Sequence, residues 1–437
     1  MSAIRSSADL RSRIDAAPMS KVQTGAVAIT VALSALDGYD VLSATFAAPA
    51  ITAAWGVGKG ALGIVLASGL AGMALGAFCL APLADLFGRR KLIFLAVGLM
   101  GVGSLLTAFA GSVPELAVWR VLTGLGIGAC VAVINPIAAE FANARRRPLA
   151  MSLMAMGYPV GGVIGAVLAA IVLKVSAWPN IFLIGAGAAA LLFPIVALLL
   201  PESPAFLAAS RKPGALEALN RLLDRLGQAP LGTLPVWPEA SRRGYALILS
   251  GVQRRVTIQL ALVGFLYSAV AYYTLSWLPQ MVADAGFDPS KASVAALVAN
   301  LVGIVGGVAF GLLGGALGVR RLTVAMMAGL GVAIAAFGVA PAHFGALVAV
   351  AAACGFFLFA GTAGLYATLA ISFSDEGRAS GSGFVSGVGR ISSAIAPALA
   401  GALFASGWGR AEVSAAFAMC AILAAVVLAR RVRTLAS

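Results

Sequence analysis

Two carboxylates stand inside an apolar stretch near the N-terminus. Asp37 and Asp40 belong to Asp37-Gly-Tyr-Asp40, and a spacing of three residues places both on one face of a helix. A charge at the centre of a bilayer costs at least about 2.5 kcal/mol, so an ionisable residue there is a functional candidate by default. Two close carboxylates in a medium of low dielectric constant favour retention of a proton on one of them. We therefore predict that this pair carries protons, with no choice yet between the two residues.

Two arginines also lie within apolar runs. Arg120 falls near one end of its run, whereas Arg390 falls near the middle of its own, beside the small residues of Ser386-Gly-Val-Gly389. A guanidinium binds a carboxylate through two parallel hydrogen bonds, so we predict that both arginines bind an anionic substrate. The competing interpretation for Arg120 is a permanent pair with the aspartates that only fixes helix packing. For Arg390 it is pairing with a backbone carbonyl or with the same aspartates.

Aromatic and amide side chains in the apolar runs could line a cavity for an organic anion with an apolar body. Tyr158 is included because an offset of 232 residues places it opposite Arg390 if the two halves of the chain repeat. For each residue alone, helix packing or lipid contact is the competing interpretation. The predicted substrate-binding residues of this kind are Tyr39, Asn135, Tyr158, Tyr273, Trp277, Asn300, Phe357 and Tyr366, and Tyr272, Phe356 and Phe359 are further aromatic residues of the same runs.

The composition requires a membrane around these residues. Of 437 residues, 61% are hydrophobic and only 11% are charged, and the mean hydropathy is +1.00. This shortfall of charge excludes an ordinary soluble protein, and continuous apolar runs exclude the alternating segments of a β-barrel. Twelve runs are predicted to span the bilayer: 22–50, 61–84, 92–110, 114–140, 149–173, 178–200, 256–280, 292–317, 322–340, 344–372, 379–406 and 411–429.

A polar linker at 201–255 divides these runs into two groups of six. We therefore predict an all-α integral membrane protein with twelve transmembrane helices in two six-helix bundles, 22–200 and 256–430, flanked by tails at 1–21 and 431–437. Gly88-Arg-Arg-Lys-Leu92 and Gly318-Val-Arg-Arg-Leu322 recur at an offset of 230 residues, which indicates a duplication. An amphipathic helix lying along the membrane surface is predicted in the linker from the spacing of Leu216, Leu219, Leu222, Leu223 and Leu226.

The basic residues indicate the orientation of the chain. Most of the 30 Lys and Arg residues fall in the two tails, the linker and the turns on that same side of the membrane. Under the positive-inside rule, this side is cytoplasmic, so both termini are predicted in the cytoplasm of a bacterial cell with the chain in its inner membrane. The same bias explains the pI of about 10.3 without a nucleic-acid partner. The polar N-terminus has no short apolar core with a cleavage site, so no removable signal peptide is expected.

Enzyme chemistry finds no support in the sequence. His343 is the sole histidine, and the cysteines, Cys79, Cys130, Cys354 and Cys420, form no CxxC pair. We therefore expect no metal site and no cofactor, with protons as the coupling ion. A GxxxxGK[ST] loop is absent, so a nucleotide-driven pump is not expected either.

The twelve runs and the loop Asp85-Leu-Phe-Gly-Arg-Arg-Lys91 resemble the major facilitator superfamily, in which two bundles rock about a central site. The family loop usually reads Gly-x-x-x-Asp-Arg-x-Gly-Arg-Arg, and here Ala81 and Leu86 replace its first glycine and first arginine. Gly315 stands at the aspartate position of the second copy, so gating of that half by the same salt bridge is not implied. Further matches are Arg120-Val-Leu-Thr-Gly124, Pro136-x-x-x-Glu140 and Pro201-Glu-Ser-Pro204.

This resemblance also implies roles for several charged residues. It assigns Asp85 and Arg89 to gating between the two halves. It places Glu140, Arg146 and Glu202 in the same cytoplasmic network. The competing interpretation is that these charges are solvated or serve only to orient the chain in the membrane.

Three segments are similar to those of the aromatic acid:proton symporters within the superfamily. They are Leu36-Asp-Gly-Tyr-Asp40, Ser276-Trp-Leu-Pro279 and Gly389-Arg-Ile-Ser392. The resemblance implies proton-coupled uptake of an aromatic carboxylate, such as a hydroxybenzoate, by a membrane-embedded protein that we expect to be a monomer. It assigns Asp37 and Asp40 to coupling, and Arg120 and Arg390 to the substrate. A proton-coupled exporter of a drug or metabolite, and a membrane sensor without transport, remain the alternatives.

Overall fold

The computed structural model describes residues 7–210, 212–235, 248–373 and 378–430. Residues 431–437 of the predicted C-terminal tail and the first six residues of the N-terminal tail lie outside the described residues. Twelve helices within the described part are long and apolar enough to cross a membrane, which confirms the predicted fold class. They are α2 (Lys21–Trp55), α3 (Lys59–Leu75) with its π-helical continuation η1 (Gly76–Leu80), α5 (Arg89–Ala108), α6 (Val113–Phe141), α7 (Arg147–Val175), α8 (Pro179–Leu199), α12 (Gly251–Asp284), α13 (Pro289–Leu317), α14 (Val319–Val339), α15 (Phe344–Ser372), α16 (Arg378–Ala405) and α17 (Arg410–Ala429).

Local sequence explains where the first spanning helix begins and ends. Ser20 precedes α2, and its hydroxyl accepts a hydrogen bond from the backbone of Gln23 while the Gln23 side chain accepts one from the backbone of Ser20. This capping box satisfies two backbone donors at the helix start. Gly56 ends the helix with a φ of 62°, a left-handed conformation that glycine adopts without steric cost. The helix is therefore five residues longer at its end than the predicted run 22–50.

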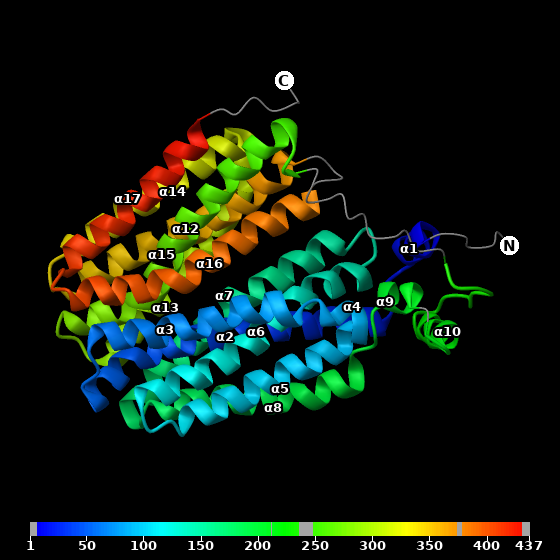
Figure 1. The fold of residues 1–437 in the computed structure, drawn as a ribbon, viewed down its shortest axis with the longest axis horizontal. Coiled ribbons are helices and arrows are strands. Elements are labelled where there is room, and N and C mark those ends of the chain that lie inside the picture. The colour runs from blue at the N-terminus through cyan, green and yellow to red at the C-terminus, as the bar shows by residue number, and fades with distance from the viewer. Residues whose placement is uncertain (1–6, 211, 236–247, 374–377, 431–437) are drawn as a thin grey trace.

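The spanning helices form two bundles that lie side by side (Figure 1). The first bundle holds α2, α3 and α5–α8, and the second holds α12–α17. The bundles meet mainly where α3 packs on α16 and α7 packs on α13, with further contacts of α2 with α12 and α13. Large apolar side chains such as Leu198 and Leu312 stay 78% exposed on the outside, where lipid would cover them. The interface between the bundles is therefore the place where polar side chains from both halves can meet.

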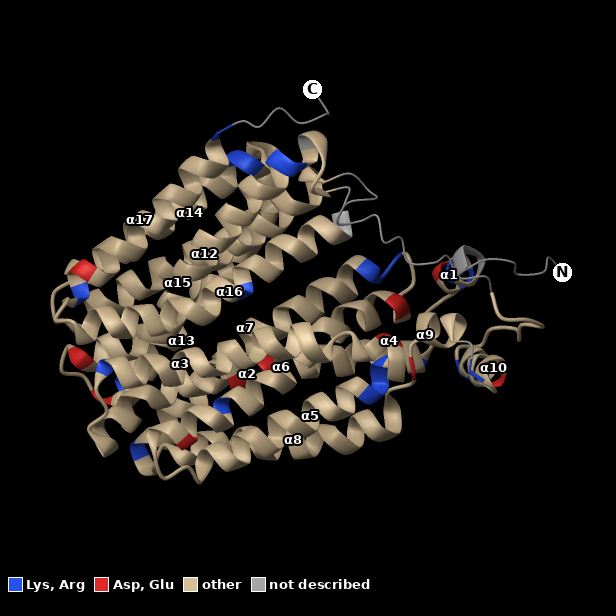
Figure 2. Cartoon of the chain, viewed as in Figure 1, with Lys and Arg blue, Asp and Glu red and all other residues tan. Residues whose placement is uncertain are grey.

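The two ends of the molecule differ. We call the end that holds α1 (Ser7–Ala16), α4 (Leu83–Phe87), α9 (Pro204–Ala209) and α10 (Ala215–Arg225) the terminal end. The opposite end, with the turns at 56–58, 176–178 and 285–288, is the far end. Charged residues gather at these ends and are sparse between them (Figure 2), as a membrane core demands. In Figure 1 the two bundles diverge toward the terminal end.

The apolar face of the linker helix packs on protein. The helix α10 forms where the leucine spacing predicts it, but Leu219 and Leu223 are covered by Leu10 and Ile14 of α1 together with Ala208 of α9. Its apolar face is therefore satisfied by protein, and contact with lipid is not needed to bury it. Residues 211 and 236–247 of the predicted linker lie outside the described residues.

Candidate functional site

The centre of the site is set by the contact between α2 and α7. Gly38 lies against the backbone of Tyr158, so close that a β-carbon at position 38 would overlap the Tyr158 carbonyl. Small residues permit this approach of two helix backbones within a membrane. The contact places the neighbouring Asp37 and the Tyr158 side chain at one level, beside the interface between the bundles.

Asp37 is buried with one oxygen unsatisfied. Its side chain is 4% exposed, and the Oδ1 atom has no hydrogen-bond partner among the described residues. The charged groups whose fields act on this carboxyl are Arg390 of α16, in the second bundle, and Asp40. The Tyr158 hydroxyl is likewise buried without a partner. A buried polar group without a partner is costly, so these atoms are candidates to bind a proton or a ligand.

The second bundle adds three residues to this centre. Arg390 is half-buried, and its guanidinium forms no hydrogen bond or ion pair to any described residue. Tyr272 of α12 and Tyr366 of α15 lie within electrostatic range of Tyr158. Tyr366 is 60% exposed, which leaves its ring accessible from the space between the bundles. We call Asp37, Tyr158, Tyr272, Tyr366 and Arg390 the central site.

Asp40 lies in a different environment, inside the first bundle. Its Oδ1 accepts a hydrogen bond of 3.1 Å from Ser104 of α5, and its side chain is only 1% exposed. Arg120 donates a 2.7 Å hydrogen bond to the backbone oxygen of Asp40 and contacts the Ser43 hydroxyl at 3.4 Å. At 2% exposure, Arg120 is held within its own bundle. The structure therefore does not bring Arg120 to the central site, and its contacts are those of the packing interpretation.

Four aromatic candidates are likewise directed away from the central site. Tyr39 donates to the Ile181 carbonyl of α8 at 2.6 Å, and Trp277 donates to the Pro397 carbonyl at 3.1 Å. Tyr273 stacks on Phe417 with ring centroids 4.1 Å apart, and Phe357 packs against Gly329 of α14. Successive residues of a helix point about 100° apart, so Tyr272 reaches the interface while Tyr273 turns inward to its own bundle.

The two predicted amides behave differently from each other. Asn135 is exposed and donates only to the Val131 carbonyl of its own helix, at 3.4 Å. Asn300 of α13 is buried, and its Oδ1 has no partner. This oxygen faces Gly162 of α7 across the bundle interface. The structure therefore brings Asn300 next to the central site but does not bring Asn135 there.

The predicted gating residues all lie at the terminal end, but only some of them contact one another. Arg89 forms an ion pair with Glu140, and the Ser203 hydroxyl donates to the same carboxylate at 2.5 Å. Glu202 accepts hydrogen bonds from the backbone nitrogens of Arg89 and Arg90 at 2.9 and 3.1 Å, at the N-terminus of α5, where the helix dipole favours a negative charge. These contacts all lie within the first bundle, so they brace that bundle rather than join the two halves.

Asp85 and Arg146 are separate from this network. Both are exposed, and neither side chain forms a hydrogen bond or ion pair to a described residue. The neighbouring Arg147 instead forms an ion pair, and its partner is Asp15 of α1.

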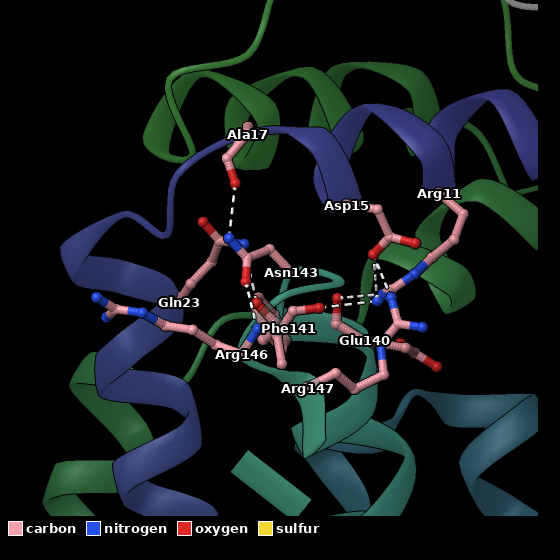
Figure 3. A network of polar contacts seen from close by, with 10 residues as sticks. Arg11, Asp15, Ala17, Gln23, Glu140, Phe141, Asn143, Arg146 and Arg147 are labelled. Atoms are coloured by element: carbon pink, nitrogen blue, oxygen red, sulfur yellow. Dashed lines mark hydrogen bonds and ion pairs between the residues drawn. The ribbon is translucent and has the colours of Figure 1, made fainter. Parts of the chain in front are cut away.

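Helix α1 is fastened to the first bundle by a polar network at the terminal end (Figure 3). Arg11 donates to the carbonyl oxygens of Glu140 and Ala142 at 2.7 Å each, and pairs with Asp15 at 2.7 Å. Asn143 donates to the Ala17 carbonyl at 2.9 Å. The sequence did not point to this network, because most of its acceptors are backbone carbonyls, which every residue carries.

The two bundles are bonded to each other at the far end. Lys59 of α3 pairs with Asp284 of α12 at 2.9 Å, and Ser290 of α13 donates to the Ala170 carbonyl of α7 at 2.8 Å. Thr52 donates to Gln280 at 3.4 Å. These three contacts join the two bundles at this end. The two bundles are therefore closed against each other at the far end.

A family model, curated relatives and a solved structure all match most of this chain. The model of the Major Facilitator Superfamily matches residues 28–308 and 260–435. The gallate transporter of Pseudomonas putida is 30% identical, over 92% of this chain and 90% of that protein. A 4-hydroxybenzoate transporter of the same organism is 28% identical, over 96% and 95% of the two chains. The crystal structure of a D-xylose-proton symporter is similar with a TM-score of 0.71 at 17% identity, covering 94% of this chain and 99% of that one.

The chain belongs to the Major Facilitator Superfamily. It is a multi-pass membrane transporter and not an enzyme, in agreement with the sequence-based expectation. Both relatives are named for an aromatic acid that they transport, which confirms the resemblance drawn from the span motifs. The likeness to the xylose symporter shows the fold alone.

Proposed function

We propose that this protein is a proton-coupled symporter that imports an aromatic carboxylate across the inner membrane of a bacterium. The observation that carries the proposal is the buried Asp37 carboxyl beside the unpaired Arg390 guanidinium, on opposite sides of the bundle interface. Arg390 supplies a carboxylate-binding group, and Asp37 supplies a proton carrier. The tyrosines of the central site provide aromatic walls for a ring. The relatives named for gallate and 4-hydroxybenzoate support the same substrate class.

Proton binding and anion binding are coupled because the charge of Arg390 acts both on Asp37 and on a bound carboxylate. Without substrate, the positive charge of Arg390 stabilises the ionised form of Asp37. A bound carboxylate neutralises that positive charge, so protonation of Asp37 becomes more favourable. By thermodynamic linkage, a proton on Asp37 then strengthens anion binding to the same extent. Proton and anion therefore enter and leave together.

Alternating access would exchange the contacts at the two ends. The terminal end is assigned to the cytoplasm because most of the basic residues lie there. The far-end contacts break when the bundles rock, and the terminal end closes. Exposed Asp85 is then available for a contact with the second bundle, as the superfamily resemblance implies. The unit that carries out this cycle is expected to be a monomer.

Uptake into proteoliposomes tests the proposal. An inward proton gradient should drive accumulation of a labelled benzoate or hydroxybenzoate above its equilibrium level. Asp37→Asn should abolish gradient-driven accumulation, and Arg390→Ala should abolish binding. Phe109→Ala, on an exposed position outside the central site, is the control. Accumulation driven by an outward proton gradient would identify an exporter, and binding without any flux would identify a sensor.

A further inference from the structure

The contact between α3 and α16 changes in character along its length. Toward the far end the two backbones touch, since a β-carbon at Gly63 would lie only 2.9 Å from the Gly401 Cα. Toward the terminal end a side chain spans the gap. The ring atom Cζ of Phe78 lies 3.6 Å from a β-carbon built on Gly387, and no other described neighbour comes within 4 Å of that point. The two helices therefore separate by about the length of a ring as they approach the terminal end.

The direction of Phe78 is set by an irregular turn in its helix. Phe78 lies in η1, where the Ala81 nitrogen donates to the Gly76 carbonyl at 3.2 Å, a bond that spans five residues. A π-helical turn winds by fewer degrees per residue than an α-helical turn, and such turns are frequent at functional sites. Gly76 is pressed against the Leu125 carbonyl of α6, so the start of the turn is fixed to the first bundle. The turn rotates Phe78 off the exposed face of Leu75 and toward α16.

The ring of Phe78 has room to move along α16. It is 59% exposed, and the surface that it meets is a glycine without a side chain. Gly383, one turn closer to the terminal end, has no neighbour within 4 Å among the described residues. Arg390 of the central site follows Gly387 by three residues, which is a rise of about 4.5 Å in the other direction. Phe78 thus lies beside the central site on its terminal side.

We propose that Phe78 is a gating residue that closes the central site toward the terminal end, with Gly387 as the surface on which its ring settles. When the far end opens, the terminal halves of α3 and α16 approach each other and the gap that the ring spans becomes narrower. The ring then lies flat on Gly387 and covers Arg390 from the terminal side. A side chain at position 387 would occupy that place. The proposal goes beyond the proposed function, because it needs neither proton coupling nor the identity of the anion.

Exchange of the bulky and the small side chain between the two helices tests the pairing. Gly387→Leu should slow uptake of labelled 4-hydroxybenzoate about tenfold without weaker binding in detergent, because overpacking penalises only closure at the terminal end. Phe78→Ala should lower the accumulated level, since the seal is lost. The double variant should recover most of both losses, as coupled neighbours do. Gly187→Leu, at an exposed position of α8 with no neighbour within 4 Å, is the matched control and should resemble the wild type.

Two results of this experiment would overturn the proposal. One is uptake at the wild-type rate in Gly387→Leu. The other is a double variant that is no better than Gly387→Leu alone, because the leucine would then not compete with the Phe78 ring.

A cross-link tests closure without a transported substrate. Phe78→Cys and Gly387→Cys are combined with Cys79→Ser, because Cys79 is exposed and would react as well. A disulfide needs β-carbons about 3.8 Å apart. In this structure the tip of the ring bridges the gap, so the two cysteines should join only when the terminal end closes. Oxidation should therefore yield the cross-link and stop uptake, and a reductant should restore it. Absence of the cross-link, or uptake that continues in its presence, would overturn the proposal even if Gly387→Leu does not reach the membrane.

Discussion

Lys59 and Asp284 join the two bundles through an ion pair of 2.9 Å at the far end. The two residues come from helices in different halves of the chain, and their side chains are 42% and 32% exposed. Exposed pairs of this kind contribute about 0.2–1 kcal/mol. The pair therefore favours closure of the far end only slightly, which suits a carrier that must open there in each cycle.

Removal of this ion pair should shift the carrier toward opening at the far end. For Lys59→Gln, we expect up to about a fivefold increase in the open population, since a population ratio follows the lost interaction energy. Alkylation of a single cysteine placed on α2 near Thr52 measures this opening. The double variant Lys59→Asp with Asp284→Lys should restore wild-type alkylation. Equal alkylation in wild type and Lys59→Gln would show that the pair has no part in closure.

Asp37 and Asp40 should respond differently to neutralisation. Asp37→Asn removes a buried charge whose Oδ1 has no partner, so we expect loss of proton-driven accumulation with thermal stability kept or raised. Asp40→Asn removes the carboxylate charge beside buried Arg120, so we expect a stability loss of about 1–3 kcal/mol. Thermal unfolding in detergent, measured beside proteoliposome uptake, separates the two effects. The reverse pattern would assign the proton to Asp40.

The two intramembrane arginines should also differ when each is replaced by lysine. Lysine keeps the charge but lacks the planar fork that binds a carboxylate through two hydrogen bonds. Arg390→Lys should therefore weaken substrate binding by about tenfold, the effect of losing one good hydrogen bond. Arg120→Lys should instead lower the unfolding temperature, because Arg120 bonds the backbone of its own bundle. Binding isotherms and melting curves of both variants decide whether this division of roles holds.

The fastening of α1 should depend on Arg11. Arg11→Ala removes two hydrogen bonds to backbone carbonyls and the pair with Asp15, which together contribute about 1–3 kcal/mol to docking of the helix. Hydrogen exchange of residues 7–16 should then become faster. Arg13→Ala is the control, because Arg13 makes a single exposed hydrogen bond to the Ala229 carbonyl. Unchanged exchange in Arg11→Ala would mean that the other contacts of α1, with Arg147, Asn143 and α10, suffice to hold the helix.

Much of the architecture was predictable from the sequence. Hydropathy is a property of each segment, so twelve spans and their division at a polar linker follow from composition alone. The sequence also shows directly which ionisable residues fall within the spans, namely Asp37, Asp40, Arg120 and Arg390. The family loop and the span motifs identified the superfamily for the same reason, because a motif is carried by adjacent residues.

The direction of each side chain was decided only by the tertiary structure. Rotation of a helix about its axis determines which neighbour a residue meets, and in a lipid environment apolar periodicity does not reveal that rotation. Tyr272 and Tyr273 are adjacent, yet one joins the central site and the other stacks on Phe417. Asp37 and Asp40 share a helix face, yet Asp40 is enclosed by α5 and α6, whereas Asp37 lies beside the bundle interface. The sequence thus determined which groups enter the membrane, and helix packing decided which of them meet.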